Sequence, residues 1–426
     1  MQNLTENNNL ARAQVAQAVR IRDYCNGIHA ILSRSNIKLD DNSTFKTAKI
    51  ILRSIDNIVD FLTGYIAGNP VSISADDENI SKMAQSIYRK GFYQKTDFEI
   101  AKNLVMYGNA YEYVYKDNQG VVRSKIINTT DAYPVYQNGE YSSFVEKYCI
   151  NPLTDDVFER QYTDTTVKEY KNGVLTATYH NTTGLPIHYV SGDMDRTEIF
   201  GQGVVGKLIP IMDEIESMLS KMYDSVQTLS LNPLLISQGQ RLDEAADSNA
   251  TGITYNLEDG ADMKYVHSEL DYNSIKLILD NLISQFWTVS NVPSALYGQS
   301  NIANISEVSL SLMFSNTSNY AKRIGMFIKY GFTERLKYWS KLMKIDMTNI
   351  DVYFNFNAPT DYKSMMESMQ IQYNCGAISK ESIIRNSPYT VDVSKELERI
   401  NKDNKNDTSV IKAKSDKELT NTVNNE

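Results

Sequence analysis

The sequence predicts an α+β protein in which helices and antiparallel strands occupy separate stretches of the chain. Apolar residues recur every three or four positions in residues 45–67, which is typical of an amphipathic helix. Residues 110–190 instead alternate apolar and polar side chains between short turns, which indicates a β-meander. Residues 206–342 combine both patterns as helix, short β segment, helix, uncharged loop and long helix. We expect the rest of the chain to be organised around this last stretch.

The bulk composition excludes several classes of protein. The chain has 426 residues, 42% hydrophobic and 22% charged, with a net charge of −9, which suits a soluble protein without a general nucleic-acid-binding surface. An acidic chain can still line a channel through which DNA passes. Cys25, Cys149 and Cys375 are far apart, so we expect no disulfide, no metal site and a reducing compartment. No signal peptide, membrane span or cofactor is expected.

The N-terminal part of the chain is predicted to be mainly helical. Residues 1–19 are polar and Asn-rich, and they are expected to form a flexible arm or a peripheral helix. The sequence Gly68–Asn69–Pro70 is a typical helix stop after residue 67. Helices are predicted over residues 20–37, 45–67, 78–90 and 92–107, with a short strand over 71–74.

The β-meander is defined by its turns. The sequences DNQG, QNGE and KNG each place glycine where a hairpin needs a positive φ angle. Short strands between them cannot bury an apolar face alone, so we expect the preceding helices to cover it.

Residues 206–342 are predicted to form a helical hairpin with a β tip. The first helix, residues 207–231, carries an apolar stripe and a separate polar stripe of Asp213, Ser217, Ser220 and Asp224. The tip covers residues 233–266 and the return helix residues 271–289. The loop over residues 291–305 has no charge, and loops of this length are usually functional or disordered, with an ordinary surface loop as the alternative. A long helix over residues 307–343 follows.

The C-terminal part is predicted to be a strand followed by short helices. Residues 351–356 read as a strand, and Ser379 is placed to cap a short helix. Helices are also expected over residues 360–376 and 393–401. The segment from 402 to 426 is polar with balanced charge, so we expect it to be disordered.

One motif suggests a nucleotide site. Gly201, Gly203 and Gly206 match the GxGxxG fingerprint, and a helix follows them. A dinucleotide site also needs a buried strand before the fingerprint and an acidic residue at the end of a second strand. Neither requirement is met, since Asp224 lies within the helix. We therefore favour a glycine-rich elbow that lets a long helix start at an angle.

Other chemistry is not indicated. His29, His180, His188 and His267 are scattered without metal-ligand spacing, and we expect surface or satisfied interior histidines. Asp213, Glu214 and Glu216 are expected on a solvated helix face rather than in a catalytic carboxylate pair.

An ordered set of segments lies between about residues 45 and 390, and none of them is specific alone. They are DNIVDFLTGYIAGNPVSI, AKNLVMYGNAYEYVY, GQGVVGKLIPIMDEIESMLSKMYD, NPLLISQG, FWTVSNVPSALYGQSNIANISEVSLSLMF and VYFNFNAPTDYKSMMESM with GAISKESII. Together and in this order, they resemble phage portal proteins, the SPP1-type or Siphoviridae-type head–tail connector family. In the fifth, SNIANISEVSL stands where the family often has SG followed by an Ala/Leu-rich helix.

The resemblance implies a portal fold and its domain order. It implies a wing of helices plus β-meander, a helical stem, a small β clip, a long kinked helix and a short helical crown in a cyclic homo-oligomer. Its segments are an arm (1–19), wing (20–203), first stem helix (204–231), clip (232–268), second stem helix (269–290), tunnel loop (291–305), long wing helix (306–345), wing strand (346–358), crown (359–401) and tail (402–426).

The resemblance also implies a function and partners. The family forms rings of about twelve copies at one capsid vertex, and double-stranded DNA passes through them during packaging and ejection. The expected partners are the terminase large subunit, head-completion or connector proteins, and the major capsid and scaffolding proteins, with no membrane. The expected location is the virion, with the host cytoplasm during assembly. No catalytic role is expected.

Three sets of residues are the candidate sites. The tunnel-loop candidates for contact with DNA are Ser294, Tyr297, Gln299, Ser300, Asn301 and Asn304. The stem-face candidates are Asp213, Ser217, Ser220 and Asp224. The clip candidates for partner docking are Gln238, Gln240, Arg241, Asp243, Glu258 and Asp259. The alternatives are another virion protein of the tail or baseplate, and an enzyme that binds a nucleotide at Gly201–Gly206.

Overall fold

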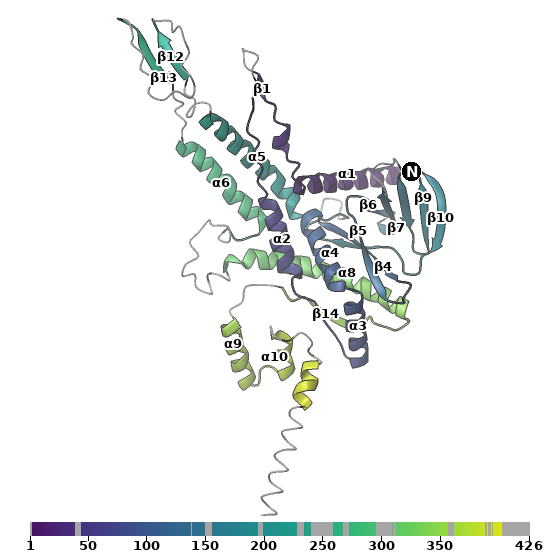
Figure 1. The fold of residues 1–426 in the computed structure, drawn as a ribbon. Coiled ribbons are helices and arrows are strands. Elements are labelled where there is room, and N and C mark those ends of the chain that lie inside the picture. The colour runs from purple at the N-terminus through teal and green to yellow at the C-terminus, as the bar shows by residue number, and fades with distance from the viewer. Residues whose placement is uncertain are drawn as a thin grey trace, which may run out of the picture. The chain divides into compact units, whose positions relative to one another are not determined.

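The computed structural model describes most of the chain, in two compact units that comprise residues 1–358 and 359–426. The described residues are 2–38, 44–137, 139–149, 156–194, 199–227, 234–239, 259–266, 272–294, 309, 312–356, 362–387, 390, 393 and 395–402. Helices and antiparallel sheets occur in separate stretches, so the fold is α+β as predicted (Figure 1).

The N-terminal part of the first unit is mainly helical. Its elements are α1 (Gln2–Cys25), the 3-10 helix η1 (Ala30–Ser33), β1 (Ile37–Lys38), β2 (Thr44–Phe45), α2 (Ser54–Ala67), β3 (Ser72–Ala75), α3 (Glu78–Lys90) and α4 (Tyr93–Tyr107). The carboxylate of Asp77 caps α3 by accepting the N–H of Asn79 at 2.8 Å. Gly108, in the left-handed conformation, ends α4.

The β-meander is divided between two sheets. Its strands are β4 (Asn109–Lys116), β5 (Val122–Ile127), β6 (Ala132–Gln137), β7 (Glu140–Tyr148), β8 (Phe158–Tyr162), β9 (Thr166–Lys171), β10 (Val174–His180) and β11 (Ile187–Val190). A three-stranded sheet has the order β11-β4-β5, and a five-stranded sheet has the order β10-β9-β8-β7-β6. The predicted KNG turn is present, with Asn172 and Gly173 both at positive φ between β9 and β10.

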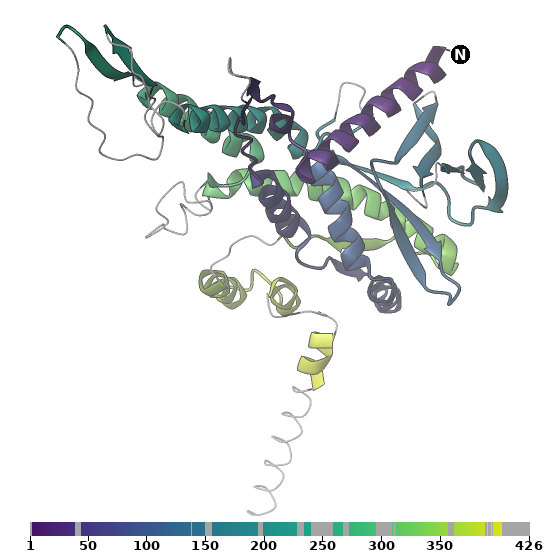
Figure 2. The same ribbon diagram turned by 45° about the horizontal axis from the view of Figure 1, so that its top comes forward.

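The hairpin region contains the predicted helices and strands. It comprises α5 (Val204–Ser225), β12 (Leu234–Gln238), β13 (Asp262–Val266), α6 (Tyr272–Ser290) and α8 (Ser315–Met343). Figures 1 and 2 show α5 and α6 side by side, and β12 pairs with β13 in an antiparallel ribbon. Strand β14 (Ile350–Tyr353) then returns to pair with β3 near the start of the chain.

One hydrophobic core joins these elements. It includes residues from helices α1 to α6, from α8 and from strands β3, β4, β5, β11 and β14. Helix α4 is central, since Ile100, Ala101, Leu104 and Val105 are all fully buried. A smaller apolar cluster lies between the two sheets of the meander and includes Tyr111, Phe144 and Tyr162. The helices and the three-stranded sheet therefore fold as one body from which the α5–α6 hairpin extends.

The second unit contains short helices. Its elements are α9 (Tyr362–Asn374), α10 (Lys380–Asn386) and a helical segment at residues 395–402. Ser379 caps α10 as predicted, because its hydroxyl accepts the N–H of Ser382 at 3.2 Å. The segment predicted to be disordered, from residue 403 onward, lies outside the described residues.

The structure corrects three boundaries. The helix predicted over residues 45–67 begins only at Ser54, and residues 46–53 are not helical. Residues 1–19 belong largely to α1, in which Ala11 and Ala18 are buried, so the helix and not the arm is observed. The long helix predicted from residue 307 is continuous from Ser315.

Candidate channel and docking elements

Three polar residues of α5 form a ladder of hydrogen bonds to the non-helical segment 46–53. The carboxylate of Glu216 accepts the backbone N–H of Leu52 at 2.7 Å, and the hydroxyl of Ser220 accepts that of Ile50 at 3.0 Å. The carboxylate of Asp224 accepts the N–H of Ala48 at 2.8 Å. We refer to Glu216, Ser220 and Asp224 as the α5 ladder.

The α5 ladder is possible because the rise of one helical turn is close to the rise of two residues in an extended chain. Four residues of a helix rise by about 6 Å, and two residues of an extended chain rise by about 6.7 Å. Side chains at positions i, i+4 and i+8 of a helix can therefore reach alternate N–H groups of an extended segment. Three alternate N–H groups of segment 46–53 are thus satisfied by side chains instead of by a neighbouring strand.

Two further groups complete the ladder. His29 lies with Nδ1 at 2.8 Å from a carboxylate oxygen of Glu216, and both side chains are buried. Arg34 forms an ion pair with Asp224 at 2.7 Å and donates to the carbonyl of Ala48. The ladder therefore fastens the chain between α1 and α2 to the side of α5.

The other helix of the hairpin has one buried and one exposed face. Phe286 is 2% exposed, and Leu279, Leu282 and Ile283 pack against the core. The opposite face exposes Lys276, Asp280 and Leu277, the last at 63%. On α5 the exposed positions are Lys207, Pro210, Glu214, Lys221 and Tyr223. Both helices therefore expose polar side chains together with some apolar ones on the face away from the core. On α5 this face is not the polar stripe predicted from the sequence.

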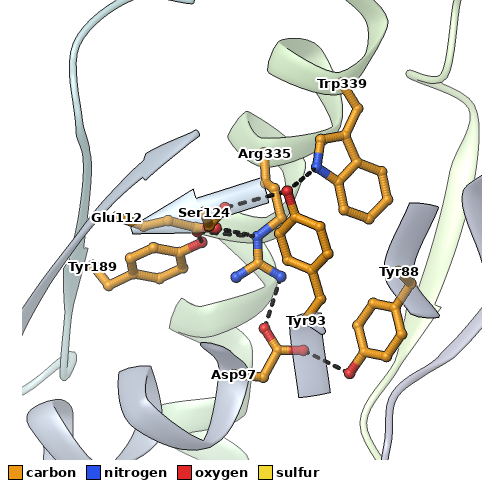
Figure 3. Close-up of polar contacts among 8 residues, drawn as sticks. All are labelled: Tyr88, Tyr93, Asp97, Glu112, Ser124, Tyr189, Arg335 and Trp339. Atoms are coloured by element: carbon orange, nitrogen blue, oxygen red, sulfur yellow. Dashed lines mark hydrogen bonds and ion pairs between the residues drawn. The ribbon is translucent and has the colours of Figure 1, made fainter. Parts of the chain in front are cut away.

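A buried ionic network joins α8, α4 and β4 (Figure 3). The guanidinium of Arg335, on α8, is fully buried. Its Nη1 donates to Asp97 of α4 at 2.7 Å, and its Nε donates to Glu112 of β4 at 3.0 Å. One cation is thus shared by two buried carboxylates from different elements.

Aromatic residues enclose this network. Tyr88 donates its hydroxyl to Asp97 at 2.8 Å, and Tyr189 donates to Glu112 at 2.5 Å (Figure 3). The guanidinium of Arg335 lies 5.1 Å from the ring centre of Tyr93. The network therefore connects α3, α4, α8 and the three-stranded sheet.

Burial and neighbouring charges shift the pKa values of Asp97 and Arg335 in opposite directions. Burial raises the pKa of Asp97 above its ordinary value, and Arg335 partly offsets this rise. Burial also lowers the pKa of Arg335, but Asp97 and Glu112 outweigh that effect and hold the pKa well above its ordinary value. Arg335 is therefore a permanent buried cation. Full burial leaves it no access to a substrate, so its role is to hold the elements together.

The glycine fingerprint is explained by close backbone packing. A Cβ atom on Gly203 would lie 2.1 Å from the carbonyl oxygen of Met106, and one on Gly201 would lie 2.2 Å from that of Gly108. The N–H of Gly201 already donates to the Asn109 side chain at 3.0 Å, and its carbonyl accepts from the same side chain at 2.9 Å. The nucleotide-site alternative is wrong, because these groups face the protein and not a ligand.

Within the described part of the chain, nothing indicates a metal or membrane site. No cluster of three or more His, Cys, Asp or Glu side chains is found there, and Cys25, Cys149 and Cys375 form no disulfide. His29 is buried and His188 is half-buried, both with hydrogen-bond partners, and His180 is exposed. None of the helices described is long and apolar enough to cross a membrane.

The sequence matches the model of one protein family over most of its length. The model of the family described as phage portal protein, SPP1 Gp6-like, matches residues 8–409. The chain belongs to this family. The resemblance found in the sequence is confirmed, and the chain is a structural portal protein and not an enzyme.

A solved structure from a phage-like particle has a similar fold. A chain from the neck of an empty gene transfer agent (GTA) particle, computed with C6 symmetry, is 12% identical with a TM-score of 0.50. The similarity covers 77% of this portal protein and 87% of that chain. A chain of the native GTA virion is 11% identical with a TM-score of 0.49, over 79% of this chain and 94% of that one. No curated protein matches the sequence.

The stem-face residues of this portal protein have different surroundings. Ser220 is 0% and Asp224 8% exposed, because both belong to the α5 ladder. Asp213 and Ser217 are half-buried. For Ser220 and Asp224 the prediction of a channel-lining face is therefore corrected, because segment 46–53 covers them. For Asp213 and Ser217 it remains a prediction.

The tunnel loop is described only at its start. Asn291 has a left-handed backbone, and its carbonyl accepts a hydrogen bond from Thr317 of α8. Val292 is 4% exposed and Ser294 is half-buried. The loop therefore leaves from a point anchored between α6 and α8. Tyr297, Gln299, Ser300, Asn301 and Asn304 lie outside the described residues.

The clip residues are described in part. Gln238 ends β12 and pairs in register with Asp262 of β13, and Gln238 and Asp259 are exposed. Gln240, Arg241, Asp243 and Glu258 lie outside the described residues. The docking role of this set remains a prediction.

Sequence reasoning missed the buried network and the α5 ladder. Arg335 carried a usable signal, since it falls on the apolar stripe of α8 with Ile328, Phe332 and Trp339. A cation on a buried stripe requires a buried partner. The ladder had no comparable signal, because Glu216, Ser220 and Asp224 read equally well as a solvated face.

Proposed function

We propose that this portal protein forms a ring of about twelve copies at one vertex of a phage capsid. The ring is the channel through which double-stranded DNA enters during packaging and leaves during ejection. The observation that carries the proposal is the α5–α6 hairpin in a chain of the portal family, since each helix buries one face and exposes polar side chains on the other.

The dimensions of such a ring suit a DNA channel. Twelve helices at a spacing of about 10 Å make a circumference near 120 Å and a radius near 19 Å. Subtracting half a helix diameter, about 5 Å, leaves a bore of roughly 28 Å, which is wide enough for a duplex.

The negative net charge of the chain favours a channel through which DNA moves, and not a surface that binds DNA tightly. Phosphate contacts dominate DNA affinity, and each copy carries a net charge of −9. The exposed positions of α5 include two basic residues, Lys207 and Lys221, and the acidic Glu214. A wall without a continuous basic stripe leaves the duplex mobile.

We assign the remaining roles by position in the chain. The ribbon β12–β13 follows α5 and precedes α6, so it forms the free end of the hairpin, where the terminase large subunit and later the head-completion or connector proteins dock. The loop after Ser294 faces the tunnel. The wing contacts the major capsid and scaffolding proteins. The protein resides in the virion, after assembly in the host cytoplasm.

Negative-stain electron microscopy of the purified full-length chain tests the ring. We expect ring-shaped particles with a central channel and about twelve-fold symmetry. A chain that stays monomeric at micromolar concentration, or forms rings too narrow for a duplex, would contradict the proposal. Crosslinking of Gln238→Cys in packaging particles then tests docking, with capture of the terminase large subunit expected and capture of capsid protein alone contrary to it.

A further inference from the structure

An exposed aromatic residue in a strained backbone position marks a second surface, away from the hairpin. Phe92 lies between α3 and α4 with φ 59° and ψ 36°, the left-handed conformation that favours Gly or Asn. Its side chain is 65% exposed. A bulky aromatic residue thus occupies a backbone position that favours a small residue. Burial of the ring does not offset this cost, because most of the ring is exposed.

The tight turn at Gly91 accounts for the left-handed backbone of Phe92, but it does not account for the exposed phenyl ring. A Cβ atom on Gly91 would lie 2.3 Å from the ring of Tyr93 and 2.7 Å from the carbonyl oxygen of Val122, so the turn is tight. The carbonyl of Phe92 accepts the N–H of Lys95 at 3.1 Å and so starts α4. Neither contact uses the phenyl group. Strain kept without a gain in packing is typical of functional positions.

Phe92 is part of the wall of an open pocket. The pocket has a volume of about 520 Å³, within the range of ligand-binding clefts, and lies between the C-terminal ends of α2 and α3 and the first turns of α4. Its lining residues are Ala67, Gly68, Tyr88, Arg89, Phe92, Gln94, Lys95 and Phe98. Phe98 is 40% exposed, so two aromatic rings are open to a partner.

The two charged residues that line the pocket are both basic. They are Arg89 and Lys95, and both are exposed. The guanidinium of Arg123 also lies 5.6 Å from the centre of the Phe92 ring, and it forms an ion pair with Asp117 at 2.6 Å. In the described part of the chain Arg89 has no ion pair, and Lys95 has only a surface contact of 3.6 Å with Glu99. The pocket is therefore basic and aromatic in a chain of net charge −9.

We propose that this pocket docks a segment of another protein that carries an apolar or aromatic side chain next to carboxylates. The apolar side chain packs on Phe92 and Phe98, and the carboxylates pair with Arg89 and Lys95. The charge complementarity and the uncovered rings carry this assignment. The proposal does not use the hairpin of α5 and α6, because the residues that line the pocket lie on α2, α3 and α4 and in the turns that follow α2 and α3.

Fluorescence anisotropy with the full-length protein tests the pocket. The probes are labelled peptides with a Trp between two Glu residues, with the Glu residues replaced by Lys, and with the Trp replaced by Ala. We expect the acidic aromatic peptide to bind at least ~10-fold more tightly than either other peptide. Equal binding of the three peptides, or no binding, overturns the proposal.

The variant Phe92→Asn separates docking from folding. Asn tolerates the left-handed conformation, so the melting temperature should stay equal or rise, while affinity for the acidic aromatic peptide falls at least ~10-fold. The matched control is Tyr330→Asn, since Tyr330 is 71% exposed on α8 outside the pocket, and its affinity should be unchanged. A clear drop in melting temperature for Phe92→Asn would instead show that the ring stabilises the fold.

Two further measurements decide the nature of the partner. Lys95→Glu should weaken binding of the acidic peptide and strengthen that of the Lys peptide. Sedimentation velocity of Phe92→Asn should show the same assembly state as the unaltered chain. Loss of assembly in that variant would assign the pocket to a neighbouring copy of this chain and overturn the proposal of a different protein.

Discussion

The buried network around Arg335 and the ladder on α5 use polar side chains in contrasting ways. In the network, a fully buried cation is shared by Asp97 and Glu112, so each charge depends on its partners. In the ladder, each rung joins one α5 side chain to one backbone N–H, and the rungs alternate along segment 46–53. His29 and Arg34 add ionic contacts at the two end rungs, and the central Ser220 rung is neutral.

This difference implies that the body of the portal protein and its α5–α6 hairpin respond differently to the loss of one polar contact. Breaking one contact of the network leaves a charge buried without compensation, which is far more costly than losing a neutral hydrogen bond such as the Ser220 rung of the ladder. The body is therefore expected to be rigid and intolerant of change. The attachment of α5 to the N-terminal segment is expected to weaken one rung at a time, which suits a hairpin that has to fit between neighbouring copies.

The largest effect is expected for Arg335→Met. The substitution leaves two buried carboxylates without a cation and should reduce the free energy of unfolding by about 3–5 kcal/mol, measured by urea denaturation. The exposed Lys337→Met on the same helix is the control and should be almost neutral. Asp97→Asn and Glu112→Gln added to Arg335→Met should recover part of the loss. If they do not, lost packing and not unpaired charge is the cause.

The next effect concerns the junction at which α5 leaves the body. Gly203→Ala forces a Cβ atom against the Met106 carbonyl and should cost about 1–3 kcal/mol or more in the free energy of unfolding. Gly206→Ala is the control from the same fingerprint, because its Cβ atom would come no closer than 3.4 Å to another residue. Alanine also favours the helix, so thermal unfolding should be unchanged or occur at a slightly higher temperature. Equal losses in both variants would refute the packing explanation.

The same junction should make stability depend on pH. His188 contacts Asn109 and Tyr136 at 3.0 Å, and burial lowers its pKa from 6.5 to about 3. Between these values the unfolded chain binds a proton that the folded chain does not, so stability should fall as pH decreases, by up to about 1.4 kcal/mol per pH unit. His188→Gln should flatten this part of the pH profile of urea denaturation. The exposed His180→Gln should keep the slope of the unaltered chain.

The smallest effect is expected for one rung of the ladder. Ser220→Ala leaves the N–H of Ile50 without its acceptor and should cost about 1 kcal/mol. Hydrogen exchange read by mass spectrometry should show faster exchange confined to residues 46–53. Ser217→Ala, one turn away and outside the ladder, is the control and should leave exchange there unchanged. A loss as large as that of Arg335→Met would remove the distinction between the two regions.

Local signals were sufficient for many elements. The predicted helix over residues 78–90 coincides with α3, because Asp77 caps its start and Gly91 follows its end. The KNG turn and the Ser379 cap were also found, since a positive φ angle or a cap depends on residues next to each other in the chain. The family could be recognised from the order of such segments.

Contacts between distant residues were not predictable in the same way. Residues 45–53 continue the helical periodicity of α2, yet side chains about 170 positions away hold them out of a helix. The stem-face stripe was read as solvent-facing for the same reason, because nothing in α5 itself shows that another segment covers Ser220 and Asp224.

The sequence by itself determined the α+β class, most of the elements, their order and the portal family. Only the tertiary structure decided the partners of its polar residues, namely that Arg335 is a buried cation, that Gly201 and Gly203 permit close packing, and that the α5 stripe binds a backbone. The physical reason is that periodicity, caps and turns are encoded by residues within a few positions. The partner of a polar group is chosen by the packing of the whole chain.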